Sequence, residues 1–234
     1  MIEDLLRAAL DDAGVPEHTA VLLLVPGYRQ GATEYAYLPP GGGPYEGFEH
    51  RVLYDAEPRL HDFGGFHRFV AYADANLPTS ALAVGLRHEA EHAAIWNRHG
   101  HPFAELESIL RKAMRDTGHG ADYTQIPTEI AANRAADAFA RAHFPDDIAA
   151  LEANERTRQF VQPGGPVDDL VGATAAMIWN YVDPNAADEQ DDDRRAFAVV
   201  VPDLEQRARG WLPIDPRYCL GRPDGVGLVV RIDE

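Results

Sequence analysis

The residues best suited to chemistry lie together in the stretch GLRHEAEHAAIW, residues 85–96, which contains His88, Glu89, Glu91 and His92. Side chains four residues apart lie on the same face of a helix, so His88 and His92 can direct two imidazoles at one metal ion. Zinc accepts imidazole nitrogen and carboxylate oxygen in a tetrahedral shell, and a catalytic zinc site leaves one position for water. The stretch therefore predicts two ligands of a zinc site.

Two carboxylates in this stretch are candidates for a general base. Glu89 follows the first histidine, which gives the spacing H-E-x-x-H, in which the glutamate lies beside the water that the metal activates. The same residues also fit the inverted motif H-x-x-E-H, in which Glu91 is the base and the ligands are unchanged. Arg87 can pair with Glu91 as a solvated ion pair, which favours Glu89 as the base. A surface helix with this ion pair and two chance histidines is the alternative to a metal site.

A third ligand is needed to distinguish a metal site from such a surface helix. The extended motif H-E-x-x-H-x-x-G-x-x-H does not fit, because Ile95 and Arg98 stand where it requires glycine and histidine. His99 and His101 are out of register, and we expect them to be surface residues. Glu129 is the better candidate because it lies early in a second, Ala-rich helical segment. A glutamate in a first turn also interacts favourably with the helix dipole, which is the alternative explanation.

Two motifs resemble a known family of enzymes. HEAEH at residues 88–92 and EIAANRAADAFA at residues 129–140 are similar to the H-E-x-x-H … E-x-x-A-N-x-F-A pattern of ImmA/IrrE-type zinc metallopeptidases. More broadly, the motifs resemble the gluzincins, in which the third ligand is a glutamate on a following helix. The resemblance covers roughly residues 65–145. The chain departs from the family at Arg87, where the family is apolar or small, and at the displaced Phe139.

The resemblance implies a role for each residue of the two motifs. His88, His92 and Glu129 would bind one zinc ion per chain. Glu89 would be the general base for hydrolysis of a peptide bond, and Asn133 would orient a ligating histidine from outside the metal shell. The strand before the first motif would offer an open edge to an extended substrate. No helix-turn-helix DNA reader is recognised, so cleavage of a repressor is not supported.

The oxyanion of the transition state also needs a donor from the protein. His119 and Tyr123 are candidates, because both lie in the Gly-containing loop 117–125 before the third-ligand helix. A solvent-exposed histidine and a packing tyrosine are the alternative interpretations. Two other functions remain open for the whole chain. One is a zincin scaffold that binds partners without catalysis, and the other is a metal-dependent hydrolase of a non-peptide bond.

The bulk composition limits the partners. The chain has 234 residues and a formal net charge of −17, and this negative field disfavours nucleic acid as a partner. Cys219 is the only cysteine, which excludes an intramolecular disulfide and a thiolate zinc site. The N-terminal residues lack the pattern of a secretion signal, and the longest apolar run, AVLLLVP, is too short to span a bilayer. We therefore expect a cytoplasmic protein with no nucleic acid or membrane partner. The resemblance to metallopeptidases implies a peptide or protein substrate.

Hydrophobic periodicity and turn residues predict the elements that position these groups. We expect strands at residues 19–25, 33–39, 48–55 and 65–74, and helices at residues 2–13, 79–98, 103–115, 128–144, 146–160 and 167–182. An acidic loop at 185–195 and a strand at 225–232 follow. These elements indicate an α+β, zincin-like fold, with a small, mostly antiparallel N-terminal sheet packed on the active-site helix and a following helical part. Residues 1–145 would form the catalytic core, and residues 146–234 a mainly helical C-terminal extension packed on it as one structural unit.

Overall fold

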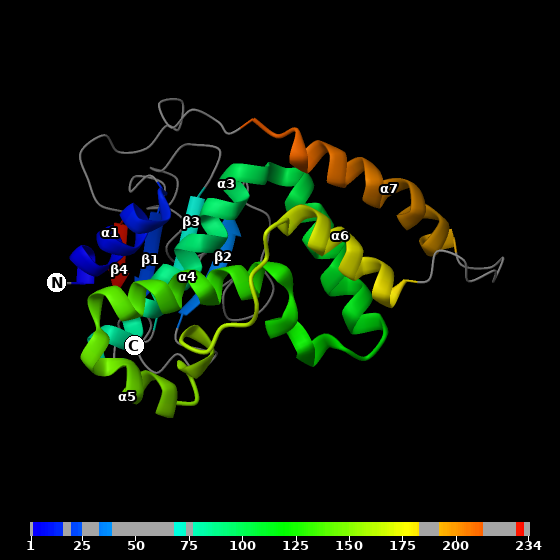
Figure 1. Cartoon of the computed structure of the whole chain (residues 1–234). Helices are drawn as coiled ribbons and strands as arrows, with labels where there is room; N and C mark the ends of the chain where they lie inside the picture. The colour runs from blue at the N-terminus through cyan, green and yellow to red at the C-terminus, as the bar shows by residue number, and fades with distance from the viewer. Residues whose placement is uncertain are drawn as a thin grey trace. The chain divides into compact units, whose positions relative to one another are not determined.

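The computed structural model describes residues 2–15, 20–24, 33–38, 68–73, 77–182, 192–212 and 228–231. Most of these residues are helical. The α-helices are α1 (Ile2–Ala13), α3 (Thr79–Asp116), α4 (Pro127–His143), α5 (Ile148–Ala153), α6 (Leu170–Tyr181) and α7 (Asp192–Arg209) (Figure 1). The short 3-10 helices are η2 (Gly120–Gln125), η3 (Pro145–Asp147) and η4 (Arg158–Phe160).

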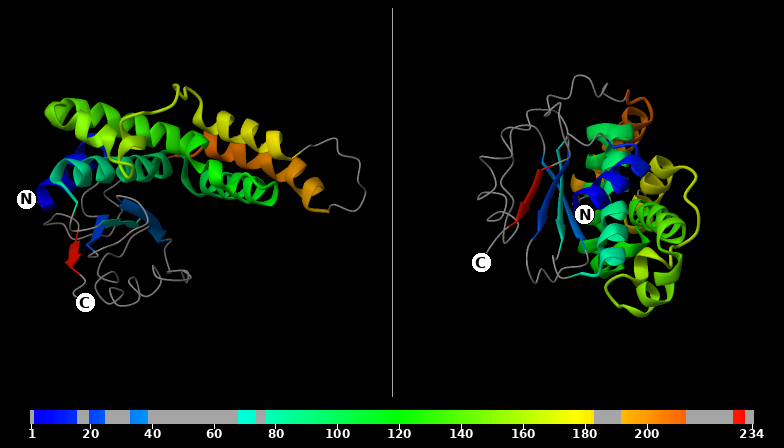
Figure 2. Two further views of the ribbon diagram at one scale, coloured as in Figure 1. Left: turned by 90° about the horizontal axis from the view of Figure 1, so that it is seen from below. Right: turned by 90° about the vertical axis from the view of Figure 1, so that its left-hand side faces the viewer.

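Short strands form one sheet. They are β1 (Ala20–Leu24), β2 (Thr33–Leu38), β3 (Arg68–Ala73) and β4 (Leu228–Arg231), and they lie side by side in the order β2-β3-β1-β4 (Figure 2). β1 pairs in parallel with both β3 and β4, whereas β2 and β3 are antiparallel. Each of these strands falls within a predicted strand segment. The predicted strand at 48–55 lies outside the described residues.

The predicted α+β fold with a small, mostly antiparallel N-terminal sheet is wrong. Helices dominate the described residues, parallel pairings outnumber the antiparallel one among the described strands, and β4 comes from the C-terminal end of the chain. Alternating patterns locate a strand but do not specify the direction of its neighbour. The missed signal is the sequence of β1, AVLLL, because an unbroken apolar run is typical of strands in parallel sheets.

The strand before α3 does not offer the open edge that the resemblance implies. β3 lies between β2 and β1 and is paired on both sides. The edges of the sheet, as far as the structure describes it, are β2 and β4. An extended substrate therefore cannot add to this sheet at β3.

The long helix α3 combines two predicted helices. Residues 79–98 and 103–115 were predicted separately, with a break at Gly100, and the backbone does leave the helical region there, with φ 67° and ψ −165°. Glycine adopts this positive φ without the steric conflict of a Cβ atom. The side chain of Trp211 lies against Gly100, so the kink is also closely packed. The predicted helix at 128–144 is confirmed as α4.

Helix prediction is less complete towards the C-terminus. The predicted helix at 167–182 is confirmed as α6, but the one at 146–160 is replaced by the short elements η3, α5 and η4. α7 begins at Asp192, inside the predicted acidic loop, so that part of the loop prediction is wrong. Acidic residues are favourable at a helix start, and the apolar residues that α7 buries recur at helical spacing. These buried residues are Val201, Leu204 and Ala208.

The chain divides into two compact units, residues 1–94, 132–163 and 214–234, and residues 95–131 and 164–213. The core of the second unit is formed by residues from the C-terminal half of α3, from α6 and from α7. Phe103, Leu110 and Ile178 are among them. The predicted domain boundary at residue 145 stays a prediction. Among the described residues, no helix combines the length and apolar character needed to cross a membrane.

In the first unit, two faces of α3 are buried. One face packs against α1, through Leu82, Leu86 and Ala90 of α3 and Leu6 and Leu10 of α1. The other face packs against α4 and the segment after it, through Ala81, Val84, Ala136, Ala140, Leu151, Phe160 and Val161. Because α3 is enclosed on two sides, polar side chains on its second face point into protein rather than water.

Candidate metal centre

His88 and His92 belong to a buried stripe of α3. Ala81 and Val84 precede them at helical spacing and pack in the same cluster as Ala136 of α4. The two histidines are only 4% and 7% exposed. The stripe therefore directs both imidazoles towards α4 and not into solvent.

The two imidazole rings are arranged as a pair of ligands. Nε2 of His88 lies 3.2 Å from Nε2 of His92, and the ring planes meet at 75°. Two nitrogens bound to zinc at about 2.0 Å with a tetrahedral angle between them are separated by roughly 3.3 Å. The histidines are therefore already at the separation that a tetrahedral zinc shell requires.

Glu129 is carried by the first turn of α4. Pro127 opens this helix, where its missing N–H is tolerated. Asn133 follows Glu129 by four residues, and Ala136 follows Asn133 by three, so all three lie on the stripe of α4 that contains the contact to α3. Glu129 is 8% exposed.

The predicted ligands come together in space. One ligand atom from each of His88, His92 and Glu129 lies within 4.8 Å of the others, in a buried group that could hold a metal ion. A surface helix with chance histidines would leave the imidazoles exposed and Glu129 remote. That alternative is wrong, because the three predicted ligands form a buried group that could hold a metal ion. That they bind a metal stays a prediction, as does the identity of the metal.

Glu89 and Glu91 have different surroundings. Glu89 is 5% exposed, and its Oε1 lies 4.0 Å from Nε2 of His88. Nη1 of Arg87 donates to Oε2 of Glu91 at 3.0 Å, and its Nε donates to Asp12 of α1. The predicted Arg87–Glu91 pair is confirmed, but it is not solvated, because Arg87 is only 6% exposed. Glu91 thus has a structural partner, whereas Glu89 lies beside the ligands.

Arg111 contacts Glu129, the predicted third ligand, and it is not among the predicted site residues. Its Nη2 donates to Oε1 of Glu129 at 2.9 Å, and its Nε donates to Oε1 of Glu107 at 2.8 Å. Burial alone would lower the pKa of Arg111, but the carboxylates of Glu107 and Glu129 outweigh burial and raise this pKa above its ordinary value. The guanidinium therefore stays charged beside the metal group. The sequence suggests the Glu107–Arg111 pair by its i,i+4 spacing, but not the contact to Glu129.

Phe160 is a second contact of the group that is not among the predicted site residues. It is part of η4 and 1% exposed, and its ring centroid lies 4.8 Å from that of His88. An aromatic ring against the imidazole restricts the orientation of His88 and excludes water from that side of the group. No local pattern in the sequence indicates this contact.

Asn133 lies one turn after Glu129 and is 5% exposed. Its Oδ1 is buried and accepts no hydrogen bond from the residues that the structure describes. A buried amide oxygen of this kind is a natural acceptor for an N–H group near the metal. Its predicted role in orienting a ligating histidine stays a prediction.

His119 and Tyr123, the predicted donors to the transition state, lie at the start of η2 and within it. Tyr123 is 43% exposed, and the side chain of His119 is 54% exposed. Nδ1 of His119 lies 3.2 Å from Oδ2 of Asp122, and its ring packs near that of Tyr181. These contacts account for His119 as a surface residue, and the donor role of both residues stays a prediction.

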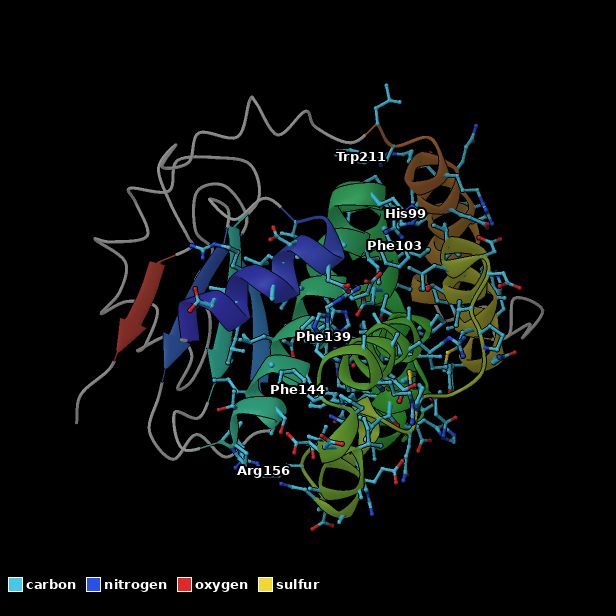
Figure 3. All side chains as sticks on the ribbon, turned by 60° about the vertical axis from the view of Figure 1, so that its left-hand side comes forward. His99, Phe103, Phe139, Phe144, Arg156 and Trp211 are labelled. Atoms are coloured by element: carbon cyan, nitrogen blue, oxygen red, sulfur yellow. The ribbon has the colours of Figure 1, made fainter. Side chains whose placement is uncertain are left out.

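His99, predicted as a surface residue, is half-buried at the kink of α3. Its ring centroid lies 5.5 Å from that of Phe103, and Trp211 lies nearby (Figure 3). Burial lowers the pKa of His99, although a backbone hydrogen bond with Ala208 opposes this effect. His99 therefore has a packing role, and the side chain of His101 lies outside the described residues.

Comparison of the chain with models of known families, with curated proteins and with solved structures finds no match. The resemblance to ImmA/IrrE-type zinc metallopeptidases stays a prediction, and it rests on the two motifs.

Proposed function

We propose that the chain is a zinc-dependent metallopeptidase in which His88, His92 and Glu129 hold the metal and Glu89 is the general base. The buried group formed by these three ligands is the observation that carries the proposal. An imidazole pair and a carboxylate are a donor set that zinc accepts, and they leave one position of a tetrahedral shell for water. The two motifs supply the reaction class, because their resemblance is to peptidases.

The charges around the group support a divalent cation. Glu89 and Glu129 are both nearly inaccessible to solvent, and buried carboxylates are costly unless a cation or hydrogen bonds compensate them. Arg111 contacts both Glu129 and Glu107. A divalent ion bound at the group would add positive charge beside the carboxylates of Glu89 and Glu129.

The residues around the group have distinct tasks in peptide hydrolysis. When bound, zinc supplies Lewis acidity that makes water a better nucleophile at neutral pH and polarises the substrate carbonyl. Glu89 accepts a proton from the attacking water and passes it to the nitrogen of the leaving amine. Phe160 and the apolar stripe of α3 keep bulk water away from His88, which strengthens electrostatic interactions inside the site.

Metal analysis tests the proposal first. Purified wild-type protein, dialysed after incubation with zinc, should contain about one zinc per chain by elemental analysis. His92→Ala and Glu129→Ala should each lose this zinc, whereas His143→Ala should keep it, because His143 is an exposed histidine of α4 outside the group. Loaded wild-type protein is then incubated with a mixed peptide library, and new termini are identified by mass spectrometry. Wild-type protein that holds no zinc after reconstitution would overturn the peptidase mechanism.

A further inference from the structure

We propose that Arg111 is a positioning residue that holds the carboxylate of Glu129 in the orientation in which it binds the metal. This inference rests on the proposed metal centre and assigns a residue to its surroundings that neither motif contains. Arg111 would not contact the substrate. It would act on the metal only through Glu129.

The geometry places one guanidinium between two carboxylates. Nη2 of Arg111 lies 2.9 Å from Oε1 of Glu129 and 2.6 Å from Oε1 of Glu107. Nε of Arg111 adds a second contact to Oε1 of Glu107 at 2.8 Å. The side chains of Glu129 and Glu107 are 11% and 8% exposed, whereas that of Arg111 is 35% exposed. Both contacts are thus largely shielded from water, where charge-assisted hydrogen bonds are strong.

A fixed carboxylate is a better metal ligand than a mobile one. Ordering a free glutamate side chain costs rotamer entropy, and this cost would otherwise reduce the affinity for the metal. A carboxylate that gives one oxygen to a guanidinium can still give its other oxygen to a cation. Glu107, four residues before Arg111 on the same helix, fixes the guanidinium in turn. The chain of contacts from Glu107 through Arg111 to Glu129 therefore orients the third ligand before the metal arrives.

The positive charge of Arg111 works against this effect. A cation close to a metal ion repels it, so removal of Arg111 would by itself strengthen metal binding. Glu107 largely neutralises this repulsion, because its carboxylate contacts the same guanidinium. Loss of Arg111 should therefore lower the metal affinity if positioning dominates, and raise it if charge repulsion dominates. A variant that removes the Glu107–Arg111 pair as a unit leaves the net charge unchanged and isolates positioning.

The experiment measures binding of Co²⁺ to the full-length apo-protein by its visible absorption, in competition with a chelator of known affinity. The variants are Arg111→Met, Arg111→Lys and the double variant Glu107→Gln/Arg111→Met. Lys112→Met is the matched control, because Lys112 is the next residue of α3 and forms an i,i+4 pair with exposed Asp116. Urea unfolding of each apo-protein checks that the fold is retained.

We expect Co²⁺ affinity to fall about 10–100-fold in Arg111→Met and in the double variant, as is usual when an outer partner of a metal ligand is lost. Arg111→Lys should recover part of the affinity, since it keeps the charge without the planar fork. The absorption bands should also change in Arg111→Met, because a loosely held Glu129 alters the coordination geometry. Lys112→Met should match the wild type.

Equal or tighter Co²⁺ binding by Arg111→Met and by the double variant, with unchanged absorption bands, would overturn the positioning role while leaving the metal centre intact. Failure of the wild-type protein to bind Co²⁺ or zinc would overturn the metal centre itself and this inference with it. The two failures are therefore distinguishable in one series of titrations.

Discussion

The neighbours of two glutamates favour one of them as the general base of the proposed peptidase. Glu89 and Glu91 are two residues apart on α3, and either one completes a known zinc motif. Glu91 accepts a hydrogen bond from buried Arg87, which also donates to Asp12 of α1. Glu91 therefore pairs with the arginine that joins α3 to α1. Oε1 of Glu89 lies 4.0 Å from Nε2 of His88, a ligand of the proposed metal centre, which is why we propose Glu89 as the base.

Replacement of Glu89 should separate metal binding from turnover. Glu89→Gln keeps the size of the side chain but removes the proton acceptor, so peptide hydrolysis should fall about 10²–10⁴-fold with zinc content unchanged. Glu91→Gln is the matched control, and it should retain turnover while lowering the urea midpoint, because Arg87 loses a charged partner. Both rates are measured on the first peptide that the wild type cleaves. Loss of turnover in Glu91→Gln alone would assign the base to the inverted motif.

At the scale of elements, the sequence predicts the helices that carry the site better than it predicts their surroundings. Periodicity and the glycine and proline signals located both halves of α3 and the start of α4, so His88, His92 and Glu129 were placed on the correct helices. The apolar stripe of α3 that contains Ala81 and Val84 continues through the two histidines, which indicates that they face α4. The strand partners of β1 and the contact of Arg111 to Glu129 depend on tertiary arrangement, and no local pattern encodes them. The start of α7 was missed because an acidic run fits both a solvated loop and a helix start.

The contact between the start of α6 and the end of α7 leads to a prediction about the pH dependence of stability. Asp169 caps α6 by accepting from the backbone N–H of Gly172 at 3.0 Å, and both Nη atoms of Arg209 donate to it. These contacts, that of Arg209 first, lower the pKa of Asp169 below its ordinary value of 3.8. Stability gained from the ionised carboxylate is therefore present above about pH 4, the range of an unperturbed Asp, and is lost as the pH falls through the lowered pKa.

Variants of Asp169 test this linkage by urea unfolding between pH 3 and pH 7. Asp169→Ala should lose about 0.5–2 kcal/mol at pH 7, the usual cost of a missing helix cap. Asp169→Asn should lose less, since asparagine also caps helices but cannot pair ionically with Arg209. The difference between wild type and Asp169→Asn should shrink below about pH 4. A difference that stays constant across the whole range would contradict an ionic contribution.

At the scale of the whole molecule, the metal group joins segments that are distant in sequence. His88 and His92 come from α3 and Glu129 from α4, so the three ligands are close only in the folded chain. A ligand that binds the folded state and not the unfolded state stabilises the fold by mass action. The net charge of −17 can also produce nonspecific metal binding, because many exposed carboxylates attract divalent cations weakly and without a defined coordination geometry.

Thermal unfolding should separate specific from diffuse metal binding. Zinc at a free concentration 100 times its Kd should stabilise the wild type by about 2.7 kcal/mol, and EDTA should reverse the gain. His92→Ala should show no gain at the same concentration, because one imidazole of the group is gone. Exposed His143 on α4 supplies the control, since His143→Ala should respond to zinc like the wild type. Magnesium at equal concentration should have little effect on any of them, because it prefers oxygen ligands to imidazole. A zinc response that persists in His92→Ala, or that magnesium reproduces, would assign the stabilisation to the acidic surface and not to the buried group.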